Sequence, residues 1–150
     1  MKKRIEINAK LVNHLVLDGK KCKSEKIVLQ SLKALQKKSK KPSTKLLQLA
    51  LINSTPLFKI STSTQKKRKK KQQKTRVKPA FISNKETRTS SAINLIVKAA
   101  SRKKSQPFFQ KFLSEILASS QNESNAIELK KDTQKQALLN RYFFKYYRWH

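Results

Sequence analysis

The sequence predicts a mainly α-helical fold, in which a six-helix bundle carries a protruding two-stranded basic β-ribbon. Two patterns predict this fold. Apolar residues recur at helical spacing in six segments, and an alternating pattern typical of strands lies on each side of a block of cations near the middle of the chain. The length of 150 residues suits one domain, so we expect residues 1–150 to form a single unit.

The first helix is expected over residues 8–17, where leucine and valine recur on one face. Residues 1–7 precede this spacing and are expected to form a short basic tail. Asp18-Gly19 should end the helix, because glycine readily adopts the left-handed conformation that closes a helix.

Two further helices are expected before the ribbon. Ser24 is a natural cap for a second helix that runs to about Lys38, with an apolar face on one side. Pro42-Ser43 begins a third helix, and Pro56 ends it, since proline interrupts helical hydrogen bonding.

The ribbon is expected over residues 57–83 as a basic arm. Residues 57–62 alternate in polarity like a strand, and 77–83 can return as a second strand. Between them, residues 66–78 hold nine cations in thirteen positions. Such blocks repel themselves until a counter-charge arrives, so the arm should order on assembly with a partner.

Three features follow the ribbon. A fourth helix is expected over 87–100, and a fifth begins at Pro107, which suits the first turn of a helix. A polar loop covers 119–125. A sixth helix is predicted from about Ala126 to Tyr146, within a C-terminal region that we define as 126–150.

Charge and composition narrow the classes of function. Thirty-seven basic residues face eight acidic ones, which gives a net charge of +29. A charge of this size destabilises a compact monomer unless a polyanion cancels it, and nucleic acid is the first candidate. The single cysteine excludes an internal disulfide, and the single glycine excludes a Gly-rich phosphate loop. With no metal-ligand cluster and no paired carboxylates, we expect no enzyme, no cofactor and no metal site.

The last nine residues hold six of the eleven aromatic side chains. A terminus this rich in rings is expected to be tied down by contacts. Phe143 and Tyr147 should pack on the bundle, whereas Arg148 and Trp149 are candidates for stacking on RNA or on a neighbouring protein.

An ordered set of short motifs carries a family resemblance. Residues 9–32 closely resemble the opening helices of the small-subunit ribosomal protein seven family, and the match continues in order to residue 149. The elements that carry it are Ala9-Lys10, Val12-Asn13, Asp18-Gly19-Lys20-Lys21, Glu25, Ile27-Val28, Leu32, Ala50-Leu51, Asn53, Pro56, Ile96-Val97, Ala99-Ala100, Arg102-Lys103, Lys130-Lys131-Asp132-Thr133, Ala137, Asn140, Phe143 and Tyr147-Arg148-Trp149.

The resemblance implies a structural protein that binds the head domain of small-subunit rRNA, near the exit-site tRNA and the mRNA path. It implies proteins nine, eleven and thirteen of the small subunit as neighbours. Two departures concern the ribbon and the helix after it. The family's Gly-Gly tip and Tyr-Gln-Val-Pro-Val return strand are replaced by the cation block and residues 77–82, and a paired arginine is reduced to Thr87-Arg88.

Cations at helix ends and in the ribbon are the candidate RNA contacts, together with the aromatic end. Two other interpretations remain: the cation block as a solvated tail or nuclear-import signal, and the helix-end lysines as partners of the helix dipole. The candidates are Lys2, Lys3, Arg4, Lys20, Lys21, Lys66, Lys67, Arg68, Lys69, Lys70, Lys71, Lys74, Arg76, Lys78, Arg88, Arg102, Lys103, Lys104, Arg148 and Trp149.

The composition also bears on the compartment. Lys, Asn, Ile, Ser and Gln are abundant while Gly, Ala and Pro are scarce, a bias that an AT-rich coding genome produces. With the chain stopping just after its Tyr-Arg-Trp motif, this favours a mitochondrial, organelle-encoded member over a plastid or bacterial one.

Two binding alternatives compete with the ribosomal one. A non-specific cationic nucleic-acid chaperone would lack an ordered six-helix pattern. A membrane-active cationic protein would need one strongly basic amphipathic helix, whereas here the cations concentrate in a block that is not helical. Since the apolar runs are also far shorter than the ~20 residues of a membrane span, we expect no membrane partner.

Overall fold

The computed structural model describes residues 2–39, 41–65, 74–104 and 106–146. This part of the chain contains six α-helices, an antiparallel hairpin between the third and fourth of them, and a 3-10 helix after the sixth. This architecture confirms the predicted fold class. The elements are α1 (Lys2–Leu15), α2 (Lys21–Lys38), α3 (Ser43–Ser54), β1 (Phe58–Gln65), β2 (Lys74–Phe81), α4 (Lys85–Arg102), α5 (Phe108–Ser120), α6 (Asn125–Leu139) and the 3-10 helix Arg141–Tyr146.

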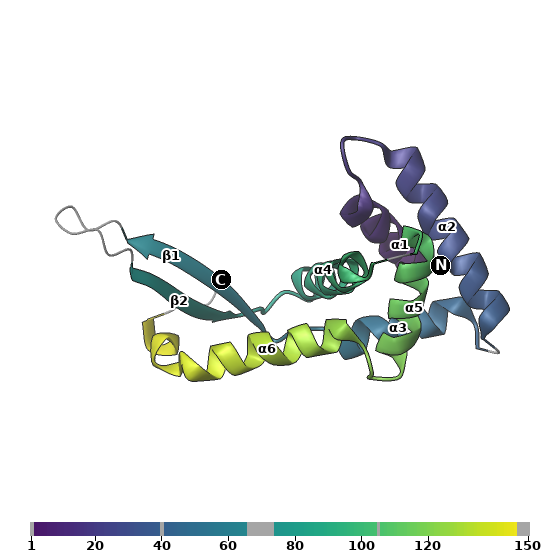
Figure 1. Ribbon diagram of the computed structural model, residues 1–150. Helices are drawn as coiled ribbons and strands as arrows, with labels where there is room; N and C mark the ends of the chain where they lie inside the picture. Colours follow the sequence, from purple (N-terminus) through teal and green to yellow (C-terminus); the bar gives the residue numbers. More distant parts are fainter. Residues whose placement is uncertain (1, 40, 66–73, 105, 147–150) are drawn as a thin grey trace.

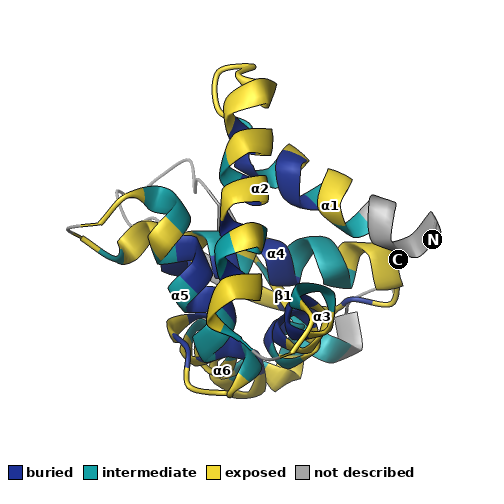
Figure 2. Cartoon of the chain, turned by 90° about the vertical axis from the view of Figure 1, so that its right-hand side faces the viewer, coloured by how far each residue is buried: buried dark blue, intermediate teal, exposed yellow. Residues whose placement is uncertain are grey.

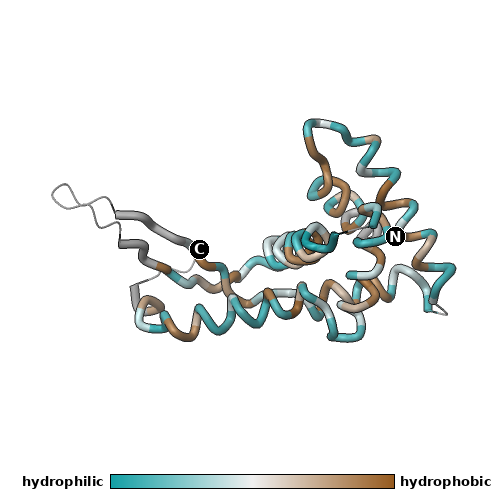
Figure 3. Tube along the Cα trace, in the orientation of Figure 1, coloured by the Kyte–Doolittle hydropathy of each residue, from teal (hydrophilic) through white to brown (hydrophobic). Residues whose placement is uncertain are grey.

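The hydrophobic core forms around α5, which packs against α2, α3, α4 and α6. Phe112 and Ile116 of α5 are almost fully buried, as are Ile93 and Ile96 of α4. Figure 2 shows buried stripes on the inner sides of these helices and exposed residues on their outer sides. Hydrophilic and hydrophobic stretches alternate along each helix in Figure 3, as expected for amphipathic helices around one core.

The ribbon projects from one end of the molecule, while α1 and α2 form the other end (Figure 1). Its strands pair from Phe58 opposite Phe81 to Gln65 opposite Lys74. At its base, the Ile82 amide donates to the Leu57 carbonyl at 3.1 Å. The strands therefore reach further toward the tip than the sequence predicts, because the Ser and Thr residues that follow the expected first strand continue its pairing.

The first helix begins at Lys2, six residues before the predicted start at residue 8, so residues 2–7 are helical. No proline or glycine interrupts these residues, and lysine, arginine and glutamate all favour helices. Ile7 also packs against the hydrophobic core. The apolar spacing of α1 therefore starts at Ile7, one turn before Leu11.

The second helix begins at Lys21, and Ser24 does not cap it, contrary to the prediction. Asp18 and Gly19 adopt φ values of 52° and 70°, and this left-handed turn reverses the chain before Lys20. Ser24 therefore falls inside the helix, where its buried hydroxyl donates to the Lys20 carbonyl at 3.5 Å.

The sixth helix ends at Leu139, seven residues before the predicted end at Tyr146. Asn140 stands in the cap position, and its side-chain amide donates to the Gln136 carbonyl at 2.9 Å. The chain then continues as the tighter 3-10 helix, which brings the Phe144 ring onto the base of the ribbon. This tertiary contact overrides the helical pattern of the sequence.

Candidate nucleic-acid interface

The turn between α1 and α2 presents two candidate cations to solvent. Lys20 and Lys21 are exposed, and their ammonium groups lie 4.0 Å and 3.9 Å from the carboxylates of Asp18 and Glu25. These pairs are long and solvated, and pairs of this kind hold their partners weakly. Both lysines can therefore turn to an external phosphate at little energetic cost.

The ribbon carries cations along β1 and β2, with no acidic residue between Phe58 and Phe81. Lys59 and Lys78 are exposed near its base. Lys74 and Arg76 lie in β2 toward the tip, opposite Gln65 and Ser63. The candidates that join the two strands, Lys66, Lys67, Arg68, Lys69, Lys70 and Lys71, lie outside the described residues.

Three phenylalanine rings fix the base of the ribbon. Phe58 and Phe81 face each other across the strands with centroids 4.5 Å apart, and Phe144 lies 5.6 Å and 5.1 Å from them. Contacts of this geometry are favourable between aromatic rings. The ribbon is thereby joined to the segment after α6. The prediction for this segment emphasised Phe143, which is half-buried; Phe144 makes the ring contacts.

Arg88 contacts the backbone of the residue that follows β2. Its Nε donates to the Ile82 carbonyl at 2.6 Å, and the side chain is half-buried. One turn earlier, the Asn84 side chain caps α4 by accepting from the Glu86 amide at 2.9 Å. Arg88 therefore links α4 to the segment that leaves the ribbon, a role that the sequence did not indicate.

Lys103 is engaged by a buried carboxylate. Its ammonium lies 2.8 Å from Glu115 Oε2, and Glu115 is fully buried in α5. The other oxygen, Oε1, accepts from the Ala126 amide at the start of α6 at 3.0 Å. This group ties the end of α4 to α5 and α6. Its neighbours Arg102 and Lys104 are exposed.

Lys130 is a second cation engaged within the fold. Its ammonium donates to the Asn53 carbonyl at 2.7 Å, and the Asn53 side-chain amide donates to the Ser119 carbonyl at 2.9 Å. Burial lowers the pKa of Lys130 from its ordinary value. A lysine amid many lysines gave no sequence signal for this role; its pairing with Asn53 emerges only from the fold.

Several remaining candidates can be placed only in part. Lys2, Lys3 and Arg4 lie on the first turn of α1, and nothing further is described of their side chains. Tyr147, Arg148 and Trp149 lie outside the described residues. His14 is half-buried, and Cys22 is exposed near Lys21.

Two other classes of site have specific structural requirements, a metal site and a membrane span. No group of three or more His, Cys, Asp or Glu side chains gathers among the described residues as a metal site would require. None of the described helices combines the length and the apolarity that a bilayer crossing needs. The interface is therefore characterised by its cations.

A family profile described as Ribosomal protein S7p/S5e matches residues 1–141. The chain belongs to this family. Among its relatives, the small ribosomal subunit protein uS7 of Pseudothermotoga lettingae is 35% identical over 90% of this chain and 83% of the relative. The protein of the same name from Thermotoga maritima is 33% identical over 94% and 86%, and that from Vibrio campbellii is 31% identical over 96% and 87%.

Family membership sets the general role of the chain. It implies a structural, non-enzymatic part in the small ribosomal subunit, with binding to small-subunit rRNA. The resemblance seen in the sequence is thereby confirmed. The named relatives are bacterial, so the expected mitochondrial compartment does not follow from them.

Proposed function

We propose that residues 1–150 act as a single domain that binds and organises the head domain of small-subunit rRNA during translation. The observation that carries this proposal is a projecting ribbon whose sequence from Phe58 to Phe81 holds cations and no acidic residue. Such an arm cannot neutralise itself and requires an external polyanion.

The mechanism combines charge neutralisation with shape. Lysine and arginine contacts to phosphate supply affinity and make it depend on salt. The protein would read mostly the backbone of the RNA, since the deep major groove of A-form RNA excludes side chains. The α1–α2 turn and the ribbon lie at opposite ends of the molecule (Figure 1), so Lys20, Lys21 and Lys78 could join separate RNA helices.

The finer placement rests on the resemblance to the protein seven family. The cation block at 66–78 would lie nearest the exit-site tRNA and the mRNA path, and proteins nine, eleven and thirteen would be the neighbours. The aromatic end, with Arg148 and Trp149, would face RNA or one of these proteins. Crosslinking from the ribbon in assembled small subunits would test this placement, with crosslinks to other rRNA domains contradicting it.

For the compartment, we propose a mitochondrial ribosome in the matrix, with an organelle-encoded gene. The support is the composition, rich in Lys, Asn, Ile, Ser and Gln and poor in Gly and Ala. Fractionation of the source cells tests it. The chain is expected in mitochondrial small subunits, whereas recovery with plastid or bacterial cytoplasmic ribosomes would overturn the proposal.

A binding titration across a salt series tests the proposed function. The purified chain is titrated against the head-domain junction of small-subunit rRNA and against an unrelated duplex of equal length. We expect a preference of about 10³ or more for the rRNA that persists as salt rises. Equal affinities that fall together with salt would favour the alternative function, a non-specific cationic nucleic-acid chaperone.

A further inference from the structure

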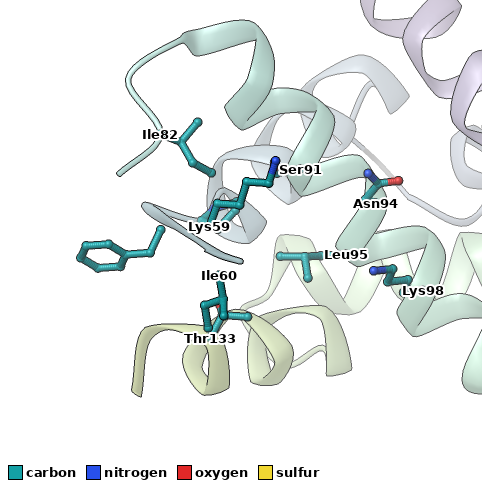
Figure 4. Close-up of a pocket in the computed structure, with 10 residues that line it drawn as sticks. Lys59, Ile60, Ile82, Ser91, Asn94, Leu95, Lys98 and Thr133 are labelled. Carbon is teal, nitrogen blue, oxygen red and sulfur yellow. The ribbon is translucent and has the colours of Figure 1, made fainter. Parts of the chain in front are cut away.

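A pocket of about 220 Å³ lies at the base of the ribbon, between β1, α4 and α6. Figure 4 shows Lys59 from β1 reaching toward α4, where Asn94, Leu95 and Lys98 follow one another along the helix. Ile60 and Thr133 line the opposite edge. The pocket is therefore lined by apolar side chains, together with an amide side chain and two cations.

We propose that this pocket takes one unstacked nucleotide of the bound RNA. The base would lie against Ile60 and Leu95, its polar edge would meet the Asn94 amide, and its phosphate would meet Lys59 or Lys98. The inference rests on the proposed function, since the RNA must already be bound. It adds a defined subsite to contacts that otherwise follow only charge and backbone shape.

The lining favours a nucleotide over a bare anion or an apolar ligand. Lys59 and Lys98 are exposed and form no ion pair within the described part of the chain, so each can accept a phosphate partner. An amide such as that of Asn94 both donates and accepts hydrogen bonds, which suits the edge of a base. Apolar contact with the base, hydrogen bonds to its edge and a cation at its phosphate are how proteins hold unpaired nucleotides.

The test fills the pocket and reads individual bases. The full chain, a Leu95→Trp variant and a Leu29→Trp control are each bound to the head-domain rRNA fragment, and base-specific chemical modification maps the reactive positions. Leu29 is an exposed leucine on α2 and does not line the pocket, so it matches the substitution without filling the site.

We expect one unpaired base to be protected by the parent and by Leu29→Trp, and to react freely when Leu95→Trp is bound. The affinity of Leu95→Trp should fall by about 5- to 100-fold, taking the loss of one base–aromatic stack as the guide to losing one base contact, while protections elsewhere persist. Identical modification patterns for the two tryptophan variants, with the rRNA preference of the parent intact, would overturn the nucleotide subsite and leave the proposed function standing. If the parent chain itself shows no preference for the head-domain rRNA over an unrelated duplex, the proposed function is contradicted instead.

A second pair of variants guards against misfolding, since Leu95 also packs partly against the core. Asn94→Ala and Lys98→Gln change exposed side chains and leave the apolar wall in place. Circular dichroism first checks that every variant retains the parent's helical content. Each of these two should raise the reactivity of the same base; unchanged reactivity with both would overturn the inference.

Discussion

Two sets of basic side chains differ in what they contact, although the sequence presents them alike. Lys103, Arg88 and Lys130 each meet a group of the protein itself, at 2.8, 2.6 and 2.7 Å. Lys20 and Lys21 are exposed at the end of the α1–α2 turn and the start of α2, and their nearest carboxylates lie 4.0 and 3.9 Å away. Burial and partner geometry, rather than local charge density, therefore decide which cations serve the fold.

The energetic reason lies in desolvation. A buried carboxylate such as Glu115 requires a close cation, because an unpaired charge in the interior is strongly unfavourable. Exposed pairs gain little over water and are screened by salt. Substitutions should therefore separate the two sets, affecting the stability of the first and the RNA affinity of the second.

The largest effect is expected for Lys103→Ala. It leaves the buried Glu115 carboxylate without its cation, and breaking such a pair costs about 3–5 kcal/mol in the free energy of unfolding. Urea denaturation followed by circular dichroism measures this loss. The matched control is the double variant Lys103→Met, Glu115→Met, which removes both charges and should be more stable than Lys103→Ala, although the Ala126 amide then loses its acceptor. A Lys103→Ala variant as stable as the parent would contradict the structural role of this ion pair.

A smaller loss is expected for Arg88→Met, which removes the donor to the Ile82 carbonyl but keeps most of the apolar stem. A buried acceptor left without its partner costs about 1–3 kcal/mol. Hydrogen exchange at the ribbon's base should also accelerate, since this bond joins the ribbon to α4. Thr87→Ala, an adjacent exposed position, is the control and should change neither quantity.

The third prediction concerns the pH dependence that Lys130 contributes. Because burial lowers its pKa in the folded state, the unfolded chain holds more protons as pH approaches 10.5, and stability contributed by this group rises with pH there. Below the folded-state pKa both states are protonated, and the desolvation penalty is fully present. Denaturation at a series of pH values measures the free energy of unfolding. As pH rises toward 10.5, the parent should gain stability relative to Lys130→Met. Stability curves of the two proteins that stay parallel across these pH values would contradict the prediction.

The smallest effect on stability is expected for Lys20→Gln and Lys21→Gln. Their long exposed ion pairs contribute about 0–1 kcal/mol, so the unfolding free energy should stay within that range of the parent. Thermal melting measures the change. A loss as large as that of Arg88→Met would show that these lysines stabilise the fold, as Lys103, Arg88 and Lys130 do.

The helices and the ribbon could be predicted because apolar spacing and strand alternation are local patterns. The error at the end of α6 occurred where a distant contact sets the element's limit, whereas the start of α2 at Lys21 follows from the local turn at Asp18-Gly19. The early end of α6 depends on Phe144 meeting rings from Phe58 and Phe81, more than sixty residues away, and no local pattern encodes that contact. The early start of α1 places Ile7 within the helix, where it packs against the core.

The exposure of some candidate cations could be predicted from the sequence, but the role of each cation could not. The turn at Lys20 and the ribbon at Lys78 present exposed charge, as their surroundings in the sequence suggested. The partners of Lys103 and Lys130 come from α5 and α3, and only the packing of helices brings them together. A lone buried glutamate in an apolar segment, Glu115, was the available signal for one of them.

The most direct test of whether the exposed cations bind RNA is the salt dependence of rRNA binding by a triple variant, Lys20→Gln, Lys21→Gln, Lys78→Gln. The slope of log affinity against log salt is negative. If the three lysines contact phosphates, the variant's slope should be smaller in magnitude than the parent's by about 2–3, with thermal stability unchanged. A control that removes the same charge at exposed positions outside the candidate interface, Lys33→Gln, Lys37→Gln, Lys38→Gln, should change the slope less. Equal slopes for the parent and the first variant would contradict the account, because the exposed cations would then not be RNA contacts.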